Sequence, residues 1–423
     1  MYETEPVSVS LTENRWNDDD AARWERDAGA EPADRDLALR IYTSRLIGGD
    51  PDLVLHGGGN TSVKTRRGTS GEVMHVKGSG WDLATIEAPG LPALHLDAIR
   101  SGGRAGALSD PEMVALLRAN LLDAQSPNPS LETLLHGFLP AKFVDHSHAT
   151  AVLALVNQPD AAEICGVVYG DRLAVVPYVM PGFDLSIAAA EIADANPEAE
   201  GLWLVNHGLF TFGETARQSY DRMIEFVNMA ERHLASHGIA ILPTDEGPQE
   251  HRFIDLLKER LQAAGPVFAD AIAIDARTGP TIRTFHEHPD LADLATRGTV
   301  TPDHVIRVKP FPLLLKSTDS AEAIDRALKN YGTRYEAYFR AGEAQAKEPK
   351  TMLDCLPRVA HIENVGMVGF GKTAGEAKIV ADLTSQSMRV MLAAESYGRF
   401  TPLTPGHLFD MEYWSLEQAK LKK

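Results

Sequence analysis

Three histidines in two short segments have the types and spacing that metal chemistry requires. His146 and His148 lie two positions apart in Phe143–Thr150, and His207 follows in the segment Val205–Phe210. Side chains alternate along a strand, so the first two histidines point to one face, and a third can approach from a strand-to-strand turn. Neutral imidazole binds divalent metals, and three protein ligands that leave an open position are typical of a catalytic site. The pattern predicts a catalytic metal centre, against the alternative of histidines that only pack in the core.

A carboxylate precedes the histidine segment. Glu132 follows Ser130 and Leu131 at the start of an apolar helical stretch, with the histidine strand just beyond it. Such a residue can serve as a metal ligand or as a general base. The alternative is an ordinary acid in the first turn of a helix, where it complements the helix dipole.

Two glycine-rich turns are candidates for binding an anion. A strand expected to begin at Leu53–Leu55 runs into Gly57–Ser62, and the short strand Val73–Lys77 runs into Gly78–Gly80. Glycine accepts backbone dihedrals that other residues avoid, so backbone amides can approach an anion closely. Neither turn has the spacing of a Walker or dinucleotide fingerprint. A phosphate cradle and a plain hairpin turn both remain open at this point.

The composition limits the classes of partner and the compartment. The chain has 423 residues, with 59 acidic against 41 basic residues and a net charge of −18. This balance argues against nucleic acid or an anionic membrane as a partner. No run approaches the ~20 apolar residues of a membrane span, and the start lacks the basic and apolar regions of a signal peptide. Cys165 and Cys355 lie far apart in apolar contexts, so we expect buried thiols in a reducing cytoplasm.

The elements that must position the candidate residues follow from hydrophobic periodicity. Leu37–Leu46 and Thr215–Leu234 read as amphipathic helices, and Leu173–Val176 and Leu202–Val205 read as strands. Residues 1–34 are polar and acidic, and we expect an arm or a mobile tail there.

The carboxy-terminal half carries a repeat signal. Asn206–Ala216 aligns with Asn364–Ala374, and 364 − 206 gives an offset of 158. At the same offset, Asp145-His146 falls on Asp303-His304. We therefore expect a second copy of the same strand-turn-helix unit in this half. Chance similarity between two such units is the alternative.

The second copy lacks the metal-binding residues. At the offset of 158, His148 and His207 are replaced by Ile306 and Val365, so a three-histidine site cannot form. We expect an acidic arm over residues 1–34, a catalytic domain over 35–245, and a degenerate repeat without a metal site over 246–423.

In their order along the chain, these motifs resemble those of the class II aldolase/adducin family, which includes the fuculose- and rhamnulose-phosphate aldolases. They are Gly58-Gly59-Asn60-Thr61-Ser62, Gly78-Ser79-Gly80, Pro129-Ser130-Leu131-Glu132, His146-Ser147-His148 and Asn206-His207-Gly208. The longer strings His56–Lys64, Lys77–Leu83 and Leu408–Trp414 are similar to the aldolase half of bifunctional rhamnulose-1-phosphate aldolase/alcohol dehydrogenases. The resemblance implies an α/β fold, with α-β-α layers around a central, mostly antiparallel sheet and a degenerate carboxy-terminal repeat of the same type.

The resemblance also implies roles for individual residues. In this family a divalent metal, usually zinc, chelates two oxygens of a ketose phosphate and stabilises the enediolate left by carbon-carbon cleavage. Carried over by position, the metal ligands are His146, His148 and His207, the acid/base is Glu132, and the substrate and phosphate residues are Gly59, Asn60, Thr61, Ser79, Gly80 and Ser130. Leu131 departs from the family, which places a second phosphate-binding serine there. Lys77 is a candidate replacement donor, although a lysine exposed to solvent at a strand end is the expected alternative.

The expected activity is metal-dependent cleavage of a ketose 1-phosphate, foremost rhamnulose 1-phosphate, into dihydroxyacetone phosphate and a hydroxyaldehyde. A sugar-acid phosphate decarboxylase, a pentulose-phosphate 4-epimerase and a non-catalytic adducin-like interaction module remain alternatives. We expect a homo-oligomer, no dehydrogenase activity of the chain itself, and a separate aldehyde dehydrogenase or reductase as a partner. Tyr413 lies near the carboxy terminus, where the smaller aldolases use a tyrosine, but the intervening repeat argues against that role here.

Overall fold

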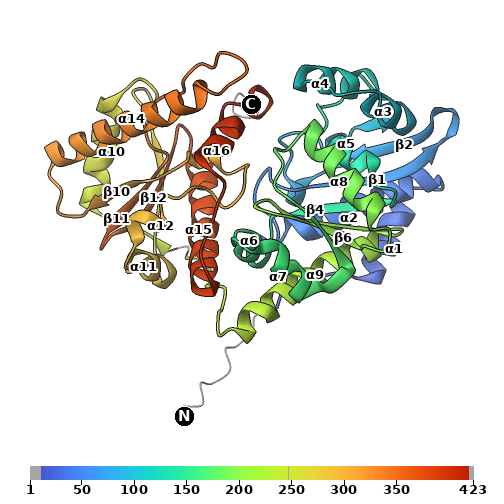
Figure 1. Ribbon diagram of the computed structural model, residues 1–423, viewed down its shortest axis with the longest axis horizontal. Coiled ribbons are helices and arrows are strands. Elements are labelled where there is room, and N and C mark those ends of the chain that lie inside the picture. The colour runs from blue at the N-terminus through green and yellow to red at the C-terminus, as the bar shows by residue number, and fades with distance from the viewer. Residues whose placement is uncertain (1–10, 246, 419–423) are drawn as a thin grey trace, which may run out of the picture. The chain divides into compact units, whose positions relative to one another are not determined.

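The computed structural model describes residues 11–245 and 247–418 (Figure 1). They divide into two compact units. Unit 1 contains the residues up to Val156 together with Asp160–Ala240, and unit 2 contains Asn157–Pro159 together with the residues from Ile241 onward. Within the described residues, every helix is too short or too polar to cross a membrane.

Unit 1 is built on a seven-stranded sheet with the order β3-β2-β1-β4-β7-β6-β5. Neighbouring strands are antiparallel except for β5 and β6, so the expected, mostly antiparallel sheet is confirmed. The strands are β1 (Asn60–Arg67), β2 (Gly71–Val76), β3 (Ala93–His95), β4 (Phe143–Ser147), β5 (Leu173–Val176), β6 (Gly201–Leu204) and β7 (Gly208–Gly213).

Helices cover both faces of this sheet, which gives the expected layers. On one face, apolar residues of α5 and α8 pack on Val144, Leu202 and Phe210 of the sheet. On the other face, α2 lies on β1 and α9 lies on β7 and β4. The helices are α1 (Asp18–Asp27), α2 (Pro32–Gly48), α3 (Leu96–Gly103), α4 (Asp110–Ala119), α5 (Thr133–Phe138), α6 (Thr150–Val156), α7 (Ala161–Tyr169), α8 (Phe183–Ala195) and α9 (Ala216–Ser236).

Two expectations for unit 1 are wrong. Leu53–Leu55 is a turn, because the backbone N–H groups of Leu53 and Val54 both donate to the carbonyl of Asp50, and the first strand begins only at Asn60. The acidic segment before residue 35 contains α1, capped by Asn17, whose backbone N–H donates to the Tyr42 hydroxyl of α2. This segment is therefore a docked helix over Asp18–Asp27, and residues 1–10 lie outside the described part.

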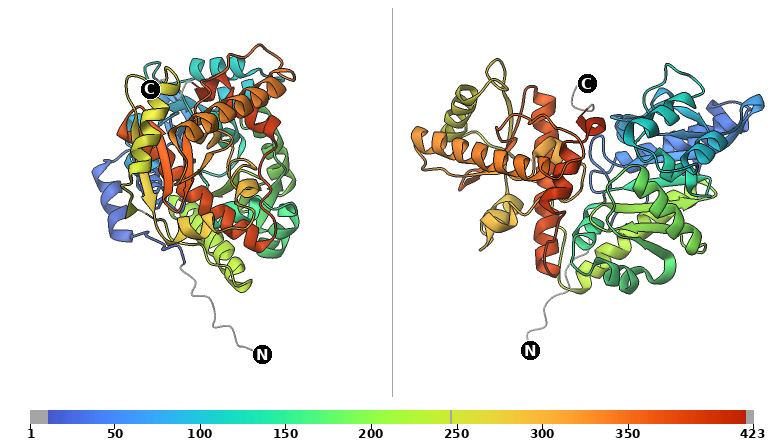
Figure 2. Two further views of the ribbon diagram at one scale, coloured as in Figure 1. Left: turned by 90° about the vertical axis from the view of Figure 1, so that its left-hand side faces the viewer. Right: turned by 45° about the horizontal axis from the view of Figure 1, so that its top comes forward.

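Unit 2 is built on a five-stranded sheet with the order β10-β11-β12-β9-β8. One face packs against α10 and α14 around a large apolar core, and the other packs against α11 and α15, the long red helix of Figures 1 and 2. The strands are β8 (Gly247–Pro248), β9 (Ala273–Thr278), β10 (Leu313–Lys316), β11 (Val359–Glu363) and β12 (Gly366–Gly371). The helices are α10 (Arg252–Ala264), α11 (Pro280–His286), α12 (Leu291–Leu294), α13 (Val305–Val308), α14 (Ala321–Glu343), α15 (Ala374–Tyr397), α16 (Pro405–Glu412) and α17 (Ser415–Gln418).

The two sheets share one arrangement. The order β5-β6-β7-β4-β1 of unit 1 matches β10-β11-β12-β9-β8 of unit 2, and in both only the first pair of strands is parallel. The hairpin Gly208–Gly213 followed by α9 corresponds, at the offset of 158, to Gly366–Gly371 followed by α15. Unit 2 is thus a second example of the same layered unit, as the repeat signal predicts.

The predicted equivalence of Asp145-His146 with Asp303-His304 is wrong. Leu209 of β7 pairs with Ser147, whereas its counterpart Met367 of β12 pairs with Arg277, so β9 is the counterpart of β4 at an offset of 277 − 147 = 130. Unit 2 therefore has 158 − 130 = 28 more residues between β9 and β12 than unit 1 has between β4 and β7. A constant offset therefore fails across this insertion, and Asp303-His304 lies in the turn before α13.

Candidate metal centre

The three predicted histidines come together in unit 1. His146 lies on β4, His148 directly follows that strand, and His207 lies in the tight turn between β6 and β7. One ligand nitrogen from each lies within 4.8 Å of the other two, and all three side chains are buried. The Nε2 atoms of His146 and His148 are 3.1 Å apart.

The hydrogen bond of His146 directs a lone pair toward the centre of the group. His146 Nδ1 lies 3.0 Å from the carbonyl oxygen of Leu209. A carbonyl oxygen only accepts, so Nδ1 carries the proton and Nε2 carries the lone pair. The buried Nδ1 of His207 has no hydrogen-bond partner among the described residues. Converging nitrogens in a buried group fit a divalent cation, with His146, His148 and His207 as its ligands.

Glycines allow the surrounding chain to approach the histidine strand. Gly208 has φ of 159°, and a Cβ there would lie 2.5 Å from the carbonyl oxygen of Ser147 and about 3.2 Å from the ring of His148. Gly59 has φ of 56°, and its Cβ would lie 2.6 Å from the carbonyl oxygen of His146. Larger residues at these two positions would displace the strand that carries two of the ligands.

A buried ion pair supports the opposite face of β4. The Arg40 guanidinium lies 2.5 Å from the Asp145 carboxylate, and both side chains are fully buried. Ser219 of α9 donates to the same carboxylate, and Arg40 also donates to the carbonyl of Val144. Burial lowers the pKa of Arg40, and the neighbouring Asp145 opposes that shift. Sequence reasoning missed this pair; a carboxylate inside the histidine strand was its only signal.

Glu132 faces the histidine group from the start of α5. Its carboxylate oxygens lie 3.8 Å from Nε2 of His146 and 3.7 Å from Nε2 of His207, and the side chain is 7% exposed. Oε1 has no hydrogen-bond partner among the described residues. The flanking Leu131 and Leu134 are buried. This position suits a proton donor or acceptor for a guest at the centre, and equally a fourth ligand.

Asn60 and Thr61, both predicted to bind phosphate, point to opposite sides of the sheet. The Asn60 amide nitrogen donates to Glu132 Oε2 at 2.5 Å and contacts Ser130 Oγ at 3.3 Å, so it belongs to the histidine side. Thr61 Oγ1 is fully buried and lies 2.8 Å from Ser44 Oγ of α2. Because neighbouring side chains on a strand alternate, the Thr61 side chain is separated from the other candidate residues.

The second glycine turn lies against the segment before Glu132. The backbone N–H of Ser79 donates to the carbonyl of Asn128 at 2.7 Å, and the N–H of Ser130 donates to the carbonyl of Lys77 at 2.9 Å. Ser79 is half-buried and Gly80 is exposed. The turn and Ser130 therefore form one structure beside the histidines, but the Ser79 amide is already bonded within it.

Lys77 has a position that sequence reasoning did not find. Its side chain is 3% exposed, and its ammonium donates to the carbonyls of Gly57 at 2.6 Å and Gly59 at 2.8 Å. A strand-end lysine exposed to solvent is thus the wrong description. The ammonium instead holds the glycine loop that precedes Asn60.

The counterpart positions in unit 2 have lost this chemistry. His146, His148 and His207 correspond to Ala276, Thr278 and Val365 by strand register and by the hairpin offset. Across residues 11–245 and 247–418, the unit 1 histidines are the one group whose three ligand atoms converge.

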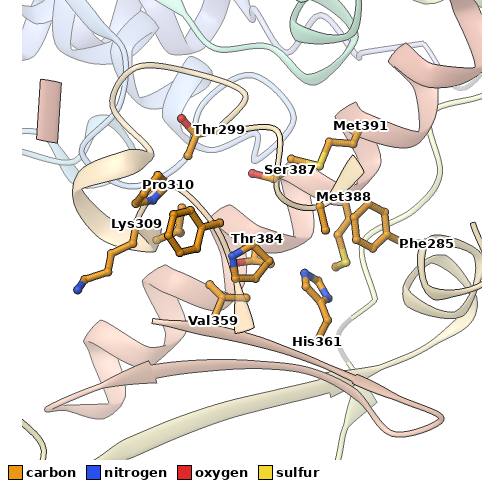
Figure 3. Close-up of a pocket in the computed structure, with 15 residues that line it drawn as sticks. Phe285, Thr299, Lys309, Pro310, Val359, His361, Thr384, Ser387, Met388 and Met391 are labelled. Carbon is orange, nitrogen blue, oxygen red and sulfur yellow. The ribbon is translucent and has the colours of Figure 1, made fainter. Parts of the chain in front are cut away.

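Unit 2 instead has a small cavity on its sheet. The buried Trp203 of β6 corresponds to His361 of β11. The smaller imidazole lines a cavity of about 40 Å³ between β11 and α15, together with Phe285, Thr384 and Met388 (Figure 3).

Comparisons with known proteins agree with this architecture. Residues 39–234 match the family model described as Class II Aldolase and Adducin N-terminal domain, and residues 249–421 match that of Aldolase class II, second domain. The chain is 34% identical over 409 residues, 90% of its length, to a protein of Bacillus subtilis (strain 168) named uncharacterized oxidoreductase YuxG. The chain spans 57% of the length of that relative.

Two solved structures are also similar. The N-terminal Class II Aldolase domain of a conserved protein from Thermoplasma acidophilum is 38% identical, with 53% of this chain and 100% of that chain covered and a TM-score of 0.46. L-fuculose-1-phosphate aldolase from Thermus thermophilus is 20% identical, with 48% and 96% covered and a TM-score of 0.33. The two matched family models cover both units, and on this ground the chain belongs to the class II aldolase/adducin family.

Proposed function

We propose that this chain is a divalent-metal-dependent aldolase that cleaves a ketose 1-phosphate into dihydroxyacetone phosphate and a hydroxyaldehyde. The observation that carries the proposal is the Glu132 carboxylate, held 3.7 to 3.8 Å from two imidazoles of a buried three-histidine group. We name rhamnulose 1-phosphate as the foremost substrate and Zn²⁺ as the metal, because three imidazoles suit zinc.

The protein residues divide the work. His146, His148 and His207 would hold the metal, which when bound supplies Lewis-acid stabilisation of negative charge on substrate oxygens. Glu132 gives a proton to the carbon that becomes part of dihydroxyacetone phosphate in cleavage, and takes it back in condensation. The buried Leu131 and Leu134 beside it exclude water from this transfer.

The phosphate end of the substrate has fewer donors than the motifs suggest. The amide of Ser79 and the ammonium of Lys77 bond within the protein, and the Leu131 side chain has no donor. The Ser130 hydroxyl oxygen accepts from Asn60 and from the backbone N–H of Glu132, so its own O–H is directed elsewhere. We assign Ser130 to a phosphate or hydroxyl oxygen of the substrate, with Gly59 and Gly80 lining the same side.

The relative named as an oxidoreductase supports a coupled second reaction. We propose that a dehydrogenase or reductase acts on the hydroxyaldehyde after cleavage, and that the aldolase itself is a homo-oligomer in the cytoplasm.

The test is cleavage of a panel of ketose 1-phosphates and their unphosphorylated forms, with the aldehyde detected by a coupled reductase. Metal content of the purified protein is measured in parallel. We expect aldehyde release that requires the metal and is fastest with a phosphorylated ketose. Carbon dioxide release without aldehyde identifies a decarboxylase, and epimerised substrate without aldehyde identifies an epimerase. A protein that binds no divalent cation is not an enzyme of this kind.

A further inference from the structure

We propose that His136 and Asn60 form a directed chain of hydrogen bonds that positions the Glu132 carboxylate for proton transfer. This inference rests on the proposed function, because it assigns a purpose to the position of Glu132. Asn60 is thereby a positioning residue for the acid/base, in place of the phosphate contact that its motif suggests. His136, which the motifs do not single out, is the second positioning residue.

The chain begins on β1 and ends on the carboxylate. Ser62 Oγ lies 2.8 Å from His136 Nδ1, His136 Nε2 contacts the amide oxygen of Asn60, and the Asn60 amide nitrogen lies 2.5 Å from Glu132 Oε2. All four side chains are buried.

The direction of every proton in this chain follows from its end. The Asn60 NH₂ group donates to Glu132 Oε2, so the amide oxygen faces His136. An amide oxygen only accepts, so His136 carries its proton on Nε2. Burial lowers the pKa of His136 well below its usual range, so the ring is neutral and its Nδ1 is unprotonated. Nδ1 then accepts from the Ser62 hydroxyl, and the donors all point toward Glu132.

Local structure brings these residues together. Glu132 and His136 are four residues apart at the start of α5, so their side chains share one face of that helix. Asn60 is directly opposite His146 in the pairing of β1 with β4, which places the amide beside the ligand strand. The Lys77 ammonium holds the carbonyl of Gly59, the peptide group that enters Asn60.

The His136 donor decides which end of the Asn60 amide meets the carboxylate. Without that donor, the amide can rotate by half a turn and present its oxygen to Glu132. The Asn60 amide oxygen and the Glu132 carboxylate oxygen, both acceptors, would then face one another. The carboxylate would move away from its position beside the bound substrate. Because the histidine ligands are untouched, metal binding should persist while proton transfer slows.

The experiment compares His136→Phe with His136→Gln in the metal-loaded full chain. Phenylalanine keeps the ring but has no donor, whereas the glutamine amide can donate to Asn60. We expect His136→Phe to lower kcat by about 10²-fold, within the range of general acid-base catalysis, with KM changed less than about threefold. His136→Gln should recover at least about tenfold of that loss. The control His75→Phe alters another buried histidine of unit 1, one that takes no part in this series of hydrogen bonds, and it should leave kcat unchanged.

Two further measurements do not depend on cleavage. The ¹⁵N spectrum of histidine-labelled parent protein should show His136 protonated on Nε2 and unprotonated on Nδ1. The visible spectrum of the Co²⁺-loaded His136→Phe protein should match that of the parent, because the ligand set is intact.

The outcomes separate this inference from the proposed function. If the unmodified protein binds no metal and cleaves no ketose, the proposed function is refuted. The role assigned to the hydrogen bonds of His136 and Asn60 is then refuted as well. If the parent is active, the inference is overturned by a His136→Phe protein with parental kcat, by a His136→Gln protein without recovery, or by a proton on Nδ1 of His136. The spectrum of the parent decides the matter even if His136→Phe does not fold.

Discussion

Units 1 and 2 have the same five-strand arrangement but differ at every position that could hold a metal. At the counterpart positions unit 1 has His146, His148 and His207, and unit 2 has Ala276, Thr278 and Val365. The hairpin that presents the third position is preserved, since Asn206 and Asn364 have φ of 56° and 63° and each is followed two residues later by glycine. The fold therefore does not need the ligands. The proposed chemistry depends on a few side chains that the fold does not require.

The two units also differ in how deeply their counterpart ion pairs are buried. Asp145 on β4 is fully buried against Arg40, whereas its counterpart Asp275 on β9 is 26% exposed beside Arg277. Arg277 also contacts Asp382 at 2.6 Å, so it keeps a partner if Asp275 is lost. Unit 1 thus depends on its fully buried pair more strongly than unit 2 depends on its partly exposed one.

The largest expected effect comes from the ligand positions. His148→Ala should abolish stoichiometric metal binding and lower aldol cleavage by at least about 10³-fold, because Lewis-acid stabilisation of the transition state is lost. Its matched control is Thr278→Ala, the same position in unit 2, which should keep both within about twofold. Metal analysis and the coupled aldehyde assay measure the two effects. Equal losses in both variants would contradict the division of labour between the units.

Glu132 should affect catalysis without affecting the metal. Glu132→Gln keeps the size of the side chain but cannot take up a proton, so we expect a fall in kcat of about 10²- to 10⁴-fold with metal still bound. Glu412→Gln, which alters a buried carboxyl of unit 2, serves as the control and should leave kcat unchanged. Full activity of Glu132→Gln would remove the acid/base role, and loss of metal would identify Glu132 as a ligand.

The two counterpart aspartates should differ in their effect on stability. Asp145→Asn leaves Arg40 buried without a charged partner, and we expect the free energy of unfolding to fall by about 3 to 5 kcal/mol. Asp275→Asn should cost at most about 1 kcal/mol, because the site is partly exposed and Arg277 retains Asp382. Urea unfolding curves of the two variants measure this difference, and similar midpoints would refute it.

The smallest expected effects are opposite pH dependences of the two units. Burial lowers the pKa of Lys64 in unit 1 from 10.5 to about 7, so between these values the unfolded chain binds the proton and stability rises with pH. Burial raises the pKa of Glu412 in unit 2 from 4.5 to about 7, so between these values the folded chain binds the proton and stability falls as pH rises.

Each of two variants should flatten only one of these two slopes of the free energy of unfolding against pH. Lys64→Met should remove the rise above pH 7, and Glu412→Gln should remove the fall below it, each slope being at most about 1.4 kcal/mol per pH unit. Urea unfolding at a series of pH values measures both, and an unchanged profile in either variant would exclude that residue as the source.

The strands and the histidine group could be predicted because they depend on local alternation and on residue types. β5, β6 and the long helix α9 follow directly from apolar spacing. The turn at Leu53–Leu55 could not be predicted in the same way, because an apolar triplet fits a strand as well as a turn closed by the Asp50 carbonyl. Helix α1 was missed because its composition is dominated by charge, and its docking depends on Tyr42 from the next helix.

The network around the histidines depends on distant pairings that spacing does not contain. Asn60 reaches Glu132 only because β1 pairs with β4, and Arg40 reaches Asp145 only because α2 lies across the sheet. The counterpart of β4 in unit 2 was assigned wrongly for a related reason, since the 28 additional residues before β12 break the constant offset. Strand register, which corrects the assignment, is a property of the folded chain.

The Lys77 ammonium has a practical consequence. Because it is enclosed by glycine carbonyls, amine-directed reagents should spare it in the native protein while they modify lysines on the surface. The rate of its acylation would therefore report how often the glycine loop opens, and a ligand that closes the loop would slow that labelling. This single lysine is thus a chemical probe of how often the loop opens.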